Sequence, residues 1–265
     1  MRKRLENKVV IVTGASKGMG AGIAKLMGSE GAKVVVNYAS SKIDAEKVVN
    51  EITYNGGIAI AIQGDITKFE DVKRLFKDTK NAFGTLDVLV NNAGIYNFAP
   101  LGGVTEDAYR KTYDLNVWGL ILTSQEAIKM FDKNGGSIIN ISAALTRSPE
   151  AHQLIYASSK NAVNSITISL AQELGPKNIR INAILPGPVM TEGAKKMHAS
   201  GSVMAEDITN GGVSEVSDMG KKMITRTALG RIGKPEDIAN MAVFLASNEA
   251  NFVTGQLIDL SGGFK

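Results

Sequence analysis

Short apolar runs alternate along the chain with longer segments whose apolar residues recur at helical spacing. The runs are rich in valine and isoleucine, which is typical of strands buried on both faces of a sheet. The strands predicted from them span residues 9–12, 33–37, 58–62, 86–90, 137–141, 179–184 and 256–259. The predicted helices lie around residues 23–27 and over about 41–55, 70–83, 105–131, 156–174 and 235–247. This alternation predicts an α/β fold in one domain, residues 1–265, with a Rossmann-type, doubly wound and mostly parallel sheet flanked by helices on both faces.

The first predicted strand runs directly into a glycine-rich turn, Thr13-Gly14-Ala15-Ser16-Lys17-Gly18-Met19-Gly20, and a helix follows. Glycines let the backbone approach a ligand closely, and the free amide groups and dipole at the start of a helix favour an anion. The segment therefore predicts a pyrophosphate site. An ordinary tight turn is the simpler interpretation, but glycines at this spacing within a β-α-β unit favour a dinucleotide site.

The end of the second predicted strand bears on the choice of cofactor. Enzymes that prefer NAD usually place an acidic residue there, which binds the ribose hydroxyls. This chain has Asn37-Tyr38-Ala39-Ser40-Ser41-Lys42 instead, so no carboxylate in this stretch would repel a 2′-phosphate. Lys17 of the glycine-rich turn adds a positive charge to the region, unless it is only a solvated loop lysine. Together these residues favour NADP(H), with NAD(H) as the alternative cofactor.

Composition narrows the class of protein. The chain has no cysteine, which excludes disulfides, thiol nucleophiles and thiolate metal sites and agrees with a reducing compartment. Its 30 basic and 26 acidic residues are scattered and give a net charge of +4, so we expect no nucleic-acid partner. The basic start, Arg2-Lys3-Arg4, precedes too short an apolar run for a signal peptide, and no run approaches the length of a membrane span. We expect a soluble cytoplasmic protein with no membrane partner.

Tyr156 and Lys160 are four residues apart on a predicted helix and therefore share one face. A free phenol has a pKa of about 10 and is a reluctant proton donor or acceptor at neutral pH. A nearby ammonium group would lower the pKa of the phenol toward the working range. Taken alone, the pair has a strong structural alternative, which is a packed ring beside a solvated lysine.

Several motifs of weak individual specificity occur together in one order. They are Thr13-Gly14-x-x-x-Gly18-x-Gly20, Asp65, Asn91-Asn92-Ala93-Gly94, Asn116, Tyr156-x-x-x-Lys160 and Pro186-Gly187-Pro188-Val189. In this combination the chain resembles the short-chain dehydrogenase/reductase family over nearly its whole length. Within the family the general pattern looks like bacterial ketoreductases, glucose-type sugar dehydrogenases and 3-oxoacyl carrier reductases.

The resemblance implies a role for each motif. Tyr156 would be the acid or base that exchanges a proton with the substrate oxygen, and Lys160 would bind the nicotinamide ribose and lower the pKa of that phenol. Asn116 would hold a water molecule in a proton relay, Asp65 would contact adenine, and Asn91 would support the adenosine side of the site. The implied cofactor contacts are Gly14, Ser16, Lys17, Gly18, Met19, Gly20, Asn37, Tyr38, Ala39, Ser40, Asp65, Ile66, Asn92, Ala93, Gly94, Tyr156, Lys160, Pro186, Gly187, Val189 and Thr191.

One position departs from the family pattern. The serine that usually hydrogen-bonds the substrate oxygen falls on Ala143, whereas Ser142 is one residue nearer the strand and should point to the other side. A local bulge would bring Ser142 into place, which keeps it a catalytic candidate. An introduced substitution and a naturally weak enzyme are the alternatives, since losing one such donor costs about 10²–10³ in turnover. We favour a deleted serine in an otherwise competent site, and the expected substrate contacts are Ala143, His152 and Gly187.

A long segment, residues 191–227, separates the predicted strand 179–184 from the next clear helix and carries several glycines and methionines. Connections of this length are usually functional or mobile, so we expect a lid over the substrate. Methionines adapt to varied apolar shapes, which favours an apolar pocket, although they would equally serve to pack the lid onto the body. The resemblance also implies a homotetramer, and the apolar stretch 118–122 fits either an interface or a core.

These expectations combine into an NADP(H)-dependent oxidoreductase that interconverts a ketone or aldehyde and an alcohol by hydride transfer, with Tyr156 as acid or base. The expected partner is a small-molecule carbonyl or alcohol, and His152 and His198 make no metal-ligand cluster. The main alternative is a cofactor-binding protein with little or no catalysis, a sensor or scaffold, which Ala143 favours. An epimerase or dehydratase on the same scaffold is a third hypothesis, and it would show no net cofactor turnover.

Overall fold

Seven strands form one sheet in the computed structural model, which describes residues 3–191 and 218–265. The strands are β1 (Val9–Val12), β2 (Lys33–Tyr38), β3 (Ile58–Gln63), β4 (Val88–Asn91), β5 (Gly136–Ile141), β6 (Ile179–Pro186) and β7 (Leu257–Leu260). Their order in the sheet is β3-β2-β1-β4-β5-β6-β7, and every pairing between neighbours is parallel. The predicted doubly wound fold is confirmed, and all the strands end at the same edge of the sheet.

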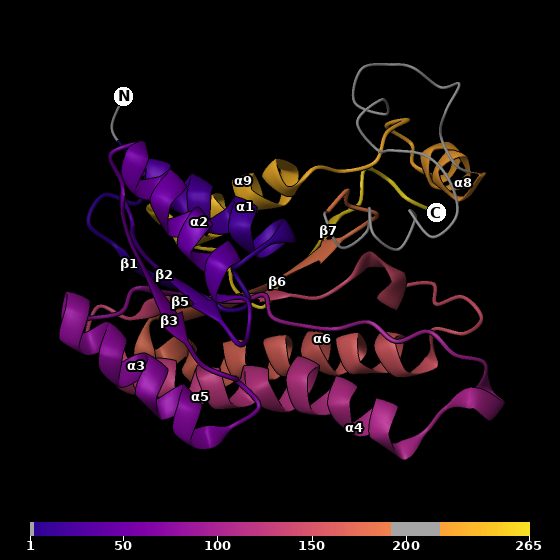
Figure 1. Ribbon diagram of the computed structural model, residues 1–265, viewed down its shortest axis with the longest axis horizontal. Coiled ribbons are helices and arrows are strands. Elements are labelled where there is room, and N and C mark those ends of the chain that lie inside the picture. Colours follow the sequence, from indigo (N-terminus) through magenta and orange to yellow (C-terminus); the bar gives the residue numbers. More distant parts are fainter. Residues whose placement is uncertain (1–2, 192–217) are drawn as a thin grey trace.

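Helices cover both faces of the sheet (Figure 1). The helices of one face are α1 (Gly18–Ser29), α2 (Lys42–Tyr54) and α9 (Pro235–Ala246). The helices of the other face are α3 (Phe69–Phe83), α4 (Glu106–Tyr113), α5 (Gly119–Met130) and α6 (Leu154–Leu174). The remaining described helix, α8 (Asp218–Arg226), lies beside the C-terminus, beyond the end of the sheet that carries β7 (Figure 1).

Successive side chains of a strand point to opposite faces of the sheet, so alternate residues belong to two separate apolar cores. In β1, Val10 and Val12 pack with the α1 and α9 layer, whereas Val9 and Ile11 pack with the α3, α5 and α6 layer. All four side chains are buried because both faces of the parallel sheet are covered. The apolar interior thus fixes the register of the strands and, with it, the positions of the residues that follow each strand.

The predicted helix over residues 105–131 is interrupted in its middle. Thr105 caps α4 by accepting a hydrogen bond from the amide of Ala108, but a π-turn, Asp114–Trp118, separates α4 from α5. The π-turn holds Asn116, which is buried. Beyond it, α5 presents Thr123 to the sheet, where its hydroxyl donates to Asn91 Oδ1 at 2.7 Å. Single wide turns of this kind often mark functional positions in helices.

Most boundaries agree with the sequence prediction to within a few residues. The strand β4 starts at Val88, and β6 continues through Pro186 because β7 pairs with its final residues. The helix α6 begins at Leu154, slightly before Tyr156. Most of the predicted lid lies outside the described residues, as do His198 and residues 192–217 as a whole, and α8 covers its last part.

Candidate active site

The glycine-rich turn is held from below by a buried asparagine at the end of β2. The backbone oxygen of Asn37 accepts from the Ala15 amide at 2.8 Å, and its side-chain oxygen accepts from the Gly14 amide at 3.3 Å. The side-chain amide of Asn37 donates to Gly64 O at 3.1 Å on the other side. Asn37 is only 1% exposed, so the structure places it beneath the turn as a support, rather than on the surface that a cofactor would contact.

A second support comes from the residues that follow β4. The Thr13 hydroxyl accepts from the backbone amides of Asn92 and Ala93, each at 3.0 Å. The side-chain amide of Asn92 donates to the Thr13 and Gly14 carbonyl oxygens at 2.9 and 3.2 Å. These bonds fix the ends of β1 and β4 against each other and leave the outer surface of the turn to a ligand.

Two glycines of the turn are required by close contact. Gly14 has a φ of +61°, and a Cβ added to it would lie 2.9 Å from Ala93 Cα. A Cβ added to Gly20 would lie 2.4 Å from Asn92 Nδ2. The helix α1 that follows has no capping side chain and no acidic residue in its first turn. Its free amide groups therefore suit a pyrophosphate, and the residues present fit a dinucleotide.

The corner at the end of β2 carries a pair of opposite charges. Lys17 is exposed at the start of α1, and its Nζ lies 3.4 Å from Asp44 Oδ2 in the first turn of α2. Ala39 and Ser40 are exposed beside this pair, whereas Tyr38 is buried. Asp44 was not predicted from the sequence, because it lies beyond the strand end, in the first turn of α2. Its position in a first helical turn was the available signal.

Asp65, which the family resemblance places at adenine, and Ile66, an expected cofactor contact, lie in the turn after β3. The Asp65 carboxylate accepts from the amide and hydroxyl of Thr67, at 3.0 and 2.8 Å, and so organises this turn. The Ile66 side chain is buried against the start of α5, where a Cβ added to Gly119 would meet its Cδ1 at 2.9 Å. Both residues occupy the same edge of the sheet as the glycine-rich turn.

Lys160, Asn116 and Gly94 come together at this edge. Lys160 is buried, and its Nζ donates to Ile141 O at 2.7 Å. A Cβ added to Gly94 would lie 3.1 Å from Asn116 Oδ1 and 3.3 Å from Lys160 Nζ. Asn116 exchanges hydrogen bonds with the backbone of Ile95, both at 2.9 Å. Residues from the segment after β4, the π-turn and α6 thereby form one cluster, although they are far apart in the sequence.

Burial is the main cause of the shifted pKa values of Tyr156 and Lys160. It raises the pKa of Tyr156 to about 12, and the phenol of Tyr96 adds to this increase. It lowers the pKa of Lys160 to about 8. The expectation that Lys160 lowers the pKa of Tyr156 is therefore wrong for this chain by itself, because burial of the phenol, with a smaller effect of Tyr96, raises that pKa instead. At neutral pH both groups carry their protons.

The loop after β6 returns toward the glycine-rich turn. A Cβ added to Gly187 would lie 2.7 Å from Ser261 Cα, so this glycine packs against the residue that follows β7. Val189 pairs with Gly233, and a Cβ added to Gly18 would lie 3.5 Å from the Thr191 side chain. The segment that ends at Thr191 and the glycine-rich turn, both expected to contact the cofactor, therefore lie against each other.

Ser142 and Ala143 follow β5, and their environments differ. The Ser142 hydroxyl is buried and lies 2.7 Å from Asn164 Oδ1 and 3.1 Å from Lys160 O, both of α6. A bulge that turns Ser142 toward a substrate is not the arrangement in this structure, because its amide continues the β5 to β6 ladder by donating to Ile184 O. The position of the expected serine therefore holds the methyl group of Ala143.

Two aromatic residues that sequence reasoning missed lie against Tyr156. The rings of Tyr96 and Phe98 are stacked, with centroids 5.8 Å apart. Each ring meets the Tyr156 ring edge-on, at centroid distances of 6.3 and 5.9 Å. Their closeness to the Asn91-Asn92-Ala93-Gly94 motif in the sequence was the only signal.

A family model described as enoyl-(acyl carrier protein) reductase matches residues 14–265. The chain belongs to the short-chain dehydrogenase/reductase family. It is therefore an oxidoreductase of a family that uses nicotinamide cofactors.

Similar proteins match over almost their whole length. An uncharacterized oxidoreductase of Methylorubrum extorquens is 45% identical over 262 residues, which cover 99% of each protein. Versicolorin reductase of Emericella nidulans is 36% identical over 260 residues, which cover 98% of this chain and 96% of that protein. The full-length match makes the whole site comparable between these short-chain dehydrogenases and this chain.

Solved structures agree with this membership. A short-chain dehydrogenase/reductase from Serratia marcescens has a TM-score of 0.88 at 33% identity, covering 98% of this chain and 99% of its own. The angucycline C-6 ketoreductase LanV with bound NADP has a TM-score of 0.86 at 30% identity, covering 98% and 96%. A 7α-hydroxysteroid dehydrogenase complexed with NADH and 7-oxo glycochenodeoxycholic acid has a TM-score of 0.87 at 35% identity, covering 99% and 96%.

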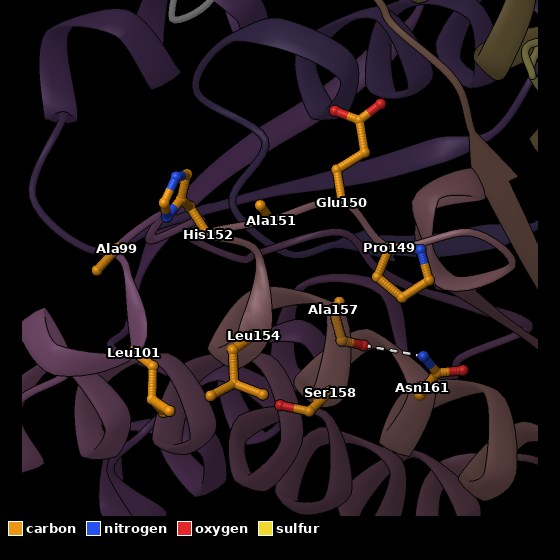
Figure 2. Close-up of a pocket in the computed structure, with 10 residues that line it drawn as sticks. All are labelled: Ala99, Leu101, Pro149, Glu150, Ala151, His152, Leu154, Ala157, Ser158 and Asn161. Carbon is orange, nitrogen blue, oxygen red and sulfur yellow. Dashed lines mark hydrogen bonds between the residues drawn. The ribbon is translucent and has the colours of Figure 1, made fainter.

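A pocket of about 560 Å³ lies beside α6 (Figure 2). Its α6 lining residues include Leu154, Ala157 and Asn161, which recur at helical spacing on one face. Tyr156 and Lys160 project from a different face of the same helix, so this pocket is separate from the cluster around Lys160. His152, an expected substrate contact, lines the pocket, and its carbonyl oxygen accepts from the Ala99 amide at 2.9 Å.

No helix within residues 3–191 and 218–265 combines the length and the apolar character needed to cross a membrane.

Proposed function

We propose that this protein is an NADP(H)-dependent oxidoreductase that interconverts a ketone or aldehyde and an alcohol, with Tyr156 as the acid or base. The observation that carries the proposal is the convergence of Tyr156, Lys160 and Asn116 on the segment that starts at Gly94. This segment follows β4, directly after the residues that hold the glycine-rich turn. A nucleotide on the turn would therefore reach the tyrosine.

The residues of the chain divide the work between them. NADP(H) supplies or accepts the hydride when bound. Tyr156 carries its proton at neutral pH, because burial raises the pKa of its phenol to about 12, and it would donate this proton to the carbonyl oxygen during reduction. Lys160 is positively charged below the pKa of about 8 that burial gives it, which favours the phenolate left after the transfer. Asn116 fixes Ile95 and thereby the segment that faces Tyr156.

The preference for NADP(H) is supported by two features. The segment 37–42 at the end of β2 carries no carboxylate, and Lys17 is exposed at the start of α1. Asp44 opposes this preference, because its carboxylate lies 3.4 Å from Lys17 Nζ. Among the solved relatives, one is a complex with NADP and another a complex with NADH. We therefore propose a preference for NADP(H) rather than exclusive use of it.

The test follows NADPH and NADH oxidation spectrophotometrically with aliphatic, aryl and sugar carbonyls. We expect ketone-dependent oxidation, with a larger kcat/KM for NADPH, and a loss of at least about 10²-fold in Tyr156→Phe. The matched control is Tyr54→Phe, which removes the hydroxyl of an exposed tyrosine at the end of α2 and should leave the rate unchanged. An unchanged rate in Tyr156→Phe would exclude this tyrosine as the acid or base.

The second candidate function is nucleotide binding with little catalysis, as in a sensor or scaffold. It is favoured by Ala143, whose methyl group occupies the position of the expected serine. Against it stands the buried Lys160, because burial of an ammonium group is costly and a binding module has no need of it. Tight NADPH binding without oxidation by any carbonyl of the panel would favour this second function.

We also propose that the enzyme is a homotetramer that works in the cytoplasm. Large apolar side chains remain half exposed on the outer side of the helices that cover one face, at Tyr109, Trp118, Leu154 and Ile168. Within the stretch 118–122, by contrast, Leu120 and Leu122 belong to the core. The lack of cysteine suits a reducing compartment. Light scattering after gel filtration measures the assembly, and a mass equal to one chain would reject it.

A further inference from the structure

Two large aromatic side chains beside Tyr156 are about half exposed to solvent, although side chains of this size are usually more buried. Tyr96 is 48% exposed and Phe98 is 47% exposed, and their stacked rings are inclined by only 22° to each other. Both meet the Tyr156 ring nearly at right angles, at 80° and 78°. We call Tyr96 and Phe98 the aromatic wall. It exposes apolar ring surface directly next to the proposed acid or base.

The aromatic wall is held in place at both ends. On one side, the backbone of Ile95 exchanges two hydrogen bonds of 2.9 Å with the buried Asn116 side chain. On the other side, the amide of Ala99 donates to His152 O at 2.9 Å, in the loop before α6. The segment that carries the two rings is thus anchored both to the π-turn and to the loop before α6. A surface fixed in this way can select a ligand without paying to become ordered.

Further apolar side chains close to the wall in the sequence are exposed as well. They are Ile95 and Leu101, on either side of the two rings. The phenol of Tyr156 beneath the rings is desolvated, which is the main reason for its raised pKa. A substrate oxygen that reaches Tyr156 must therefore bring its carbon substituents against the ring faces and edges of Tyr96 and Phe98. Flat aromatic groups gain more from such rings than saturated groups of equal size, by stacking as well as by burial.

We propose that the aromatic wall selects substrates whose carbonyl or alcohol carbon is attached to a flat aromatic ring system. This inference rests on the proposed function, because it names the substrate class of the same site. The gain from one offset-stacked or edge-on ring pair corresponds to about two- to tenfold in affinity. A saturated ring of the same carbon skeleton would be buried equally well and would lack this gain.

The test compares kcat/KM for acetophenone and for cyclohexyl methyl ketone, which share one skeleton and differ in the aromaticity of the ring. Only the ratio between the two ketones is compared across variants, so their different intrinsic reactivity cancels. We expect Phe98→Leu and Tyr96→Leu each to lower this ratio about fivefold. Tyr96→Phe keeps the ring and should change the ratio less than twofold. The matched control is Phe252→Leu, which removes a fully exposed ring in the turn before β7.

A second measurement uses the unmodified protein and needs no turnover. Calorimetry of the complex with NADP⁺, which cannot reduce a ketone, should show 2-acetylnaphthalene bound at least about fivefold more tightly than 2-acetyldecalin. The proposed selectivity would be wrong if kcat/KM fell equally for both ketones in the leucine variants, or if the two compounds bound with equal affinity in calorimetry. Preferential binding of the naphthalene compound without reduction of any carbonyl would instead support the selectivity of the aromatic wall and reject the proposed function.

Discussion

The two sides of the site are built by different means. On the cofactor side, polar side chains hold the backbone in place: those of the buried Asn37, near the end of β2, and of the partly buried Asn92, after β4. On the substrate side, the segment after Gly94 presents the half-exposed rings of Tyr96 and Phe98, and the loop after β5 carries the buried methyl group of Ala143. The cofactor would meet mainly backbone, whereas the substrate would meet mainly side chains.

The two sides should therefore differ in how well they tolerate amino-acid substitutions. A backbone surface depends on close contacts at a few glycines and on hydrogen bonds that few other side chains can replace. A side-chain surface can be exchanged one residue at a time, with the scaffold unchanged. We therefore expect substitutions on the cofactor side to abolish binding and substitutions on the substrate side to change selectivity.

The largest effect is expected at Lys160, where the two sides meet. Lys160→Met keeps most of the length of the side chain but removes its amine, and should lower kcat/KM by about 10²-fold or more. It should also remove a stability cost, because burial lowers the pKa of Lys160 from 10.5 to about 8. The favourable contribution of neutral Lys160 is present above the unfolded pKa and is lost as the pH falls through about 8.

Urea unfolding between pH 7 and pH 10 measures this second effect. The free energy of unfolding of Lys160→Met, relative to the unmodified protein, should be highest near pH 7 and should fall as the pH rises. Lys47→Met changes an exposed lysine on α2 and should show no such trend. A difference that is constant over this range would mean that burial of the ammonium group is not the cause.

The next largest effect is expected at Gly14 on the cofactor side. Gly14→Ala adds a Cβ that would lie 2.9 Å from Ala93 Cα, so the turn must shift, and we expect the affinity for NADPH to fall about thirtyfold. Gly56→Ala is the matched control, since Gly56 also has a positive φ, of +78°, but has open space around it. Both variants should lose about 1–2 kcal/mol of stability from the left-handed backbone. Equal NADPH affinity in both, by fluorescence titration, would show that crowding at the turn is unimportant.

A gain of about tenfold is expected on the substrate side. Ala143→Ser restores a hydroxyl at the position where the family resemblance places a donor to the substrate oxygen, and it should raise kcat by at least about tenfold. Ala144→Ser places the same hydroxyl one residue further along and should give no gain. If kcat is unchanged in Ala143→Ser, another group supplies the donor or none is needed.

The smallest effect is expected at Asp44, an exposed side chain of the cofactor side. Asp44→Asn releases Lys17 from its partner at 3.4 Å and removes a negative charge near the expected 2′-phosphate. Exposed charges are screened, so the ratio of kcat/KM for NADPH to that for NADH should rise only about two- to fivefold. Glu51→Gln, which changes another ion-paired residue of α2, is the control. A ratio that does not move would place the 2′-phosphate away from this corner.

The sequence indicates the place of the glycine-rich turn more directly than the arrangement around Asn116, for a physical reason. A glycine-rich turn between a strand and a helix is a local pattern, and parallel strands bring all their final residues to one edge. The exchange of hydrogen bonds between Asn116 and Ile95 depends instead on a π-turn, which the apolar pattern of residues 105–131 does not reveal. The support given by Asn37 depends on strand register, so its burial beneath the turn was not predicted.

Burial also explains why the prediction of a lowered pKa for Tyr156 was wrong. Tyr156 and Lys160 share a helix face, and from the sequence the ammonium group should lower the pKa of the phenol. The aromatic wall covers that phenol, however, and the lysine lies between β5 and α6, so both groups are desolvated. Their spacing along the helix is local information, whereas the depth at which they lie is set by the packing of the whole layer.

The π-turn at Asp114–Trp118 has a consequence for how this protein can evolve. It inserts one additional residue per turn into an otherwise regular helix, and the orientation of everything beyond it depends on that residue. Removing or adding one position would rotate α5 by about 100°, which would carry Thr123 away from Asn91 and into the apolar layer. Individual residues of the segment from α4 to α5 can be substituted, but we expect insertions and deletions in it not to be tolerated.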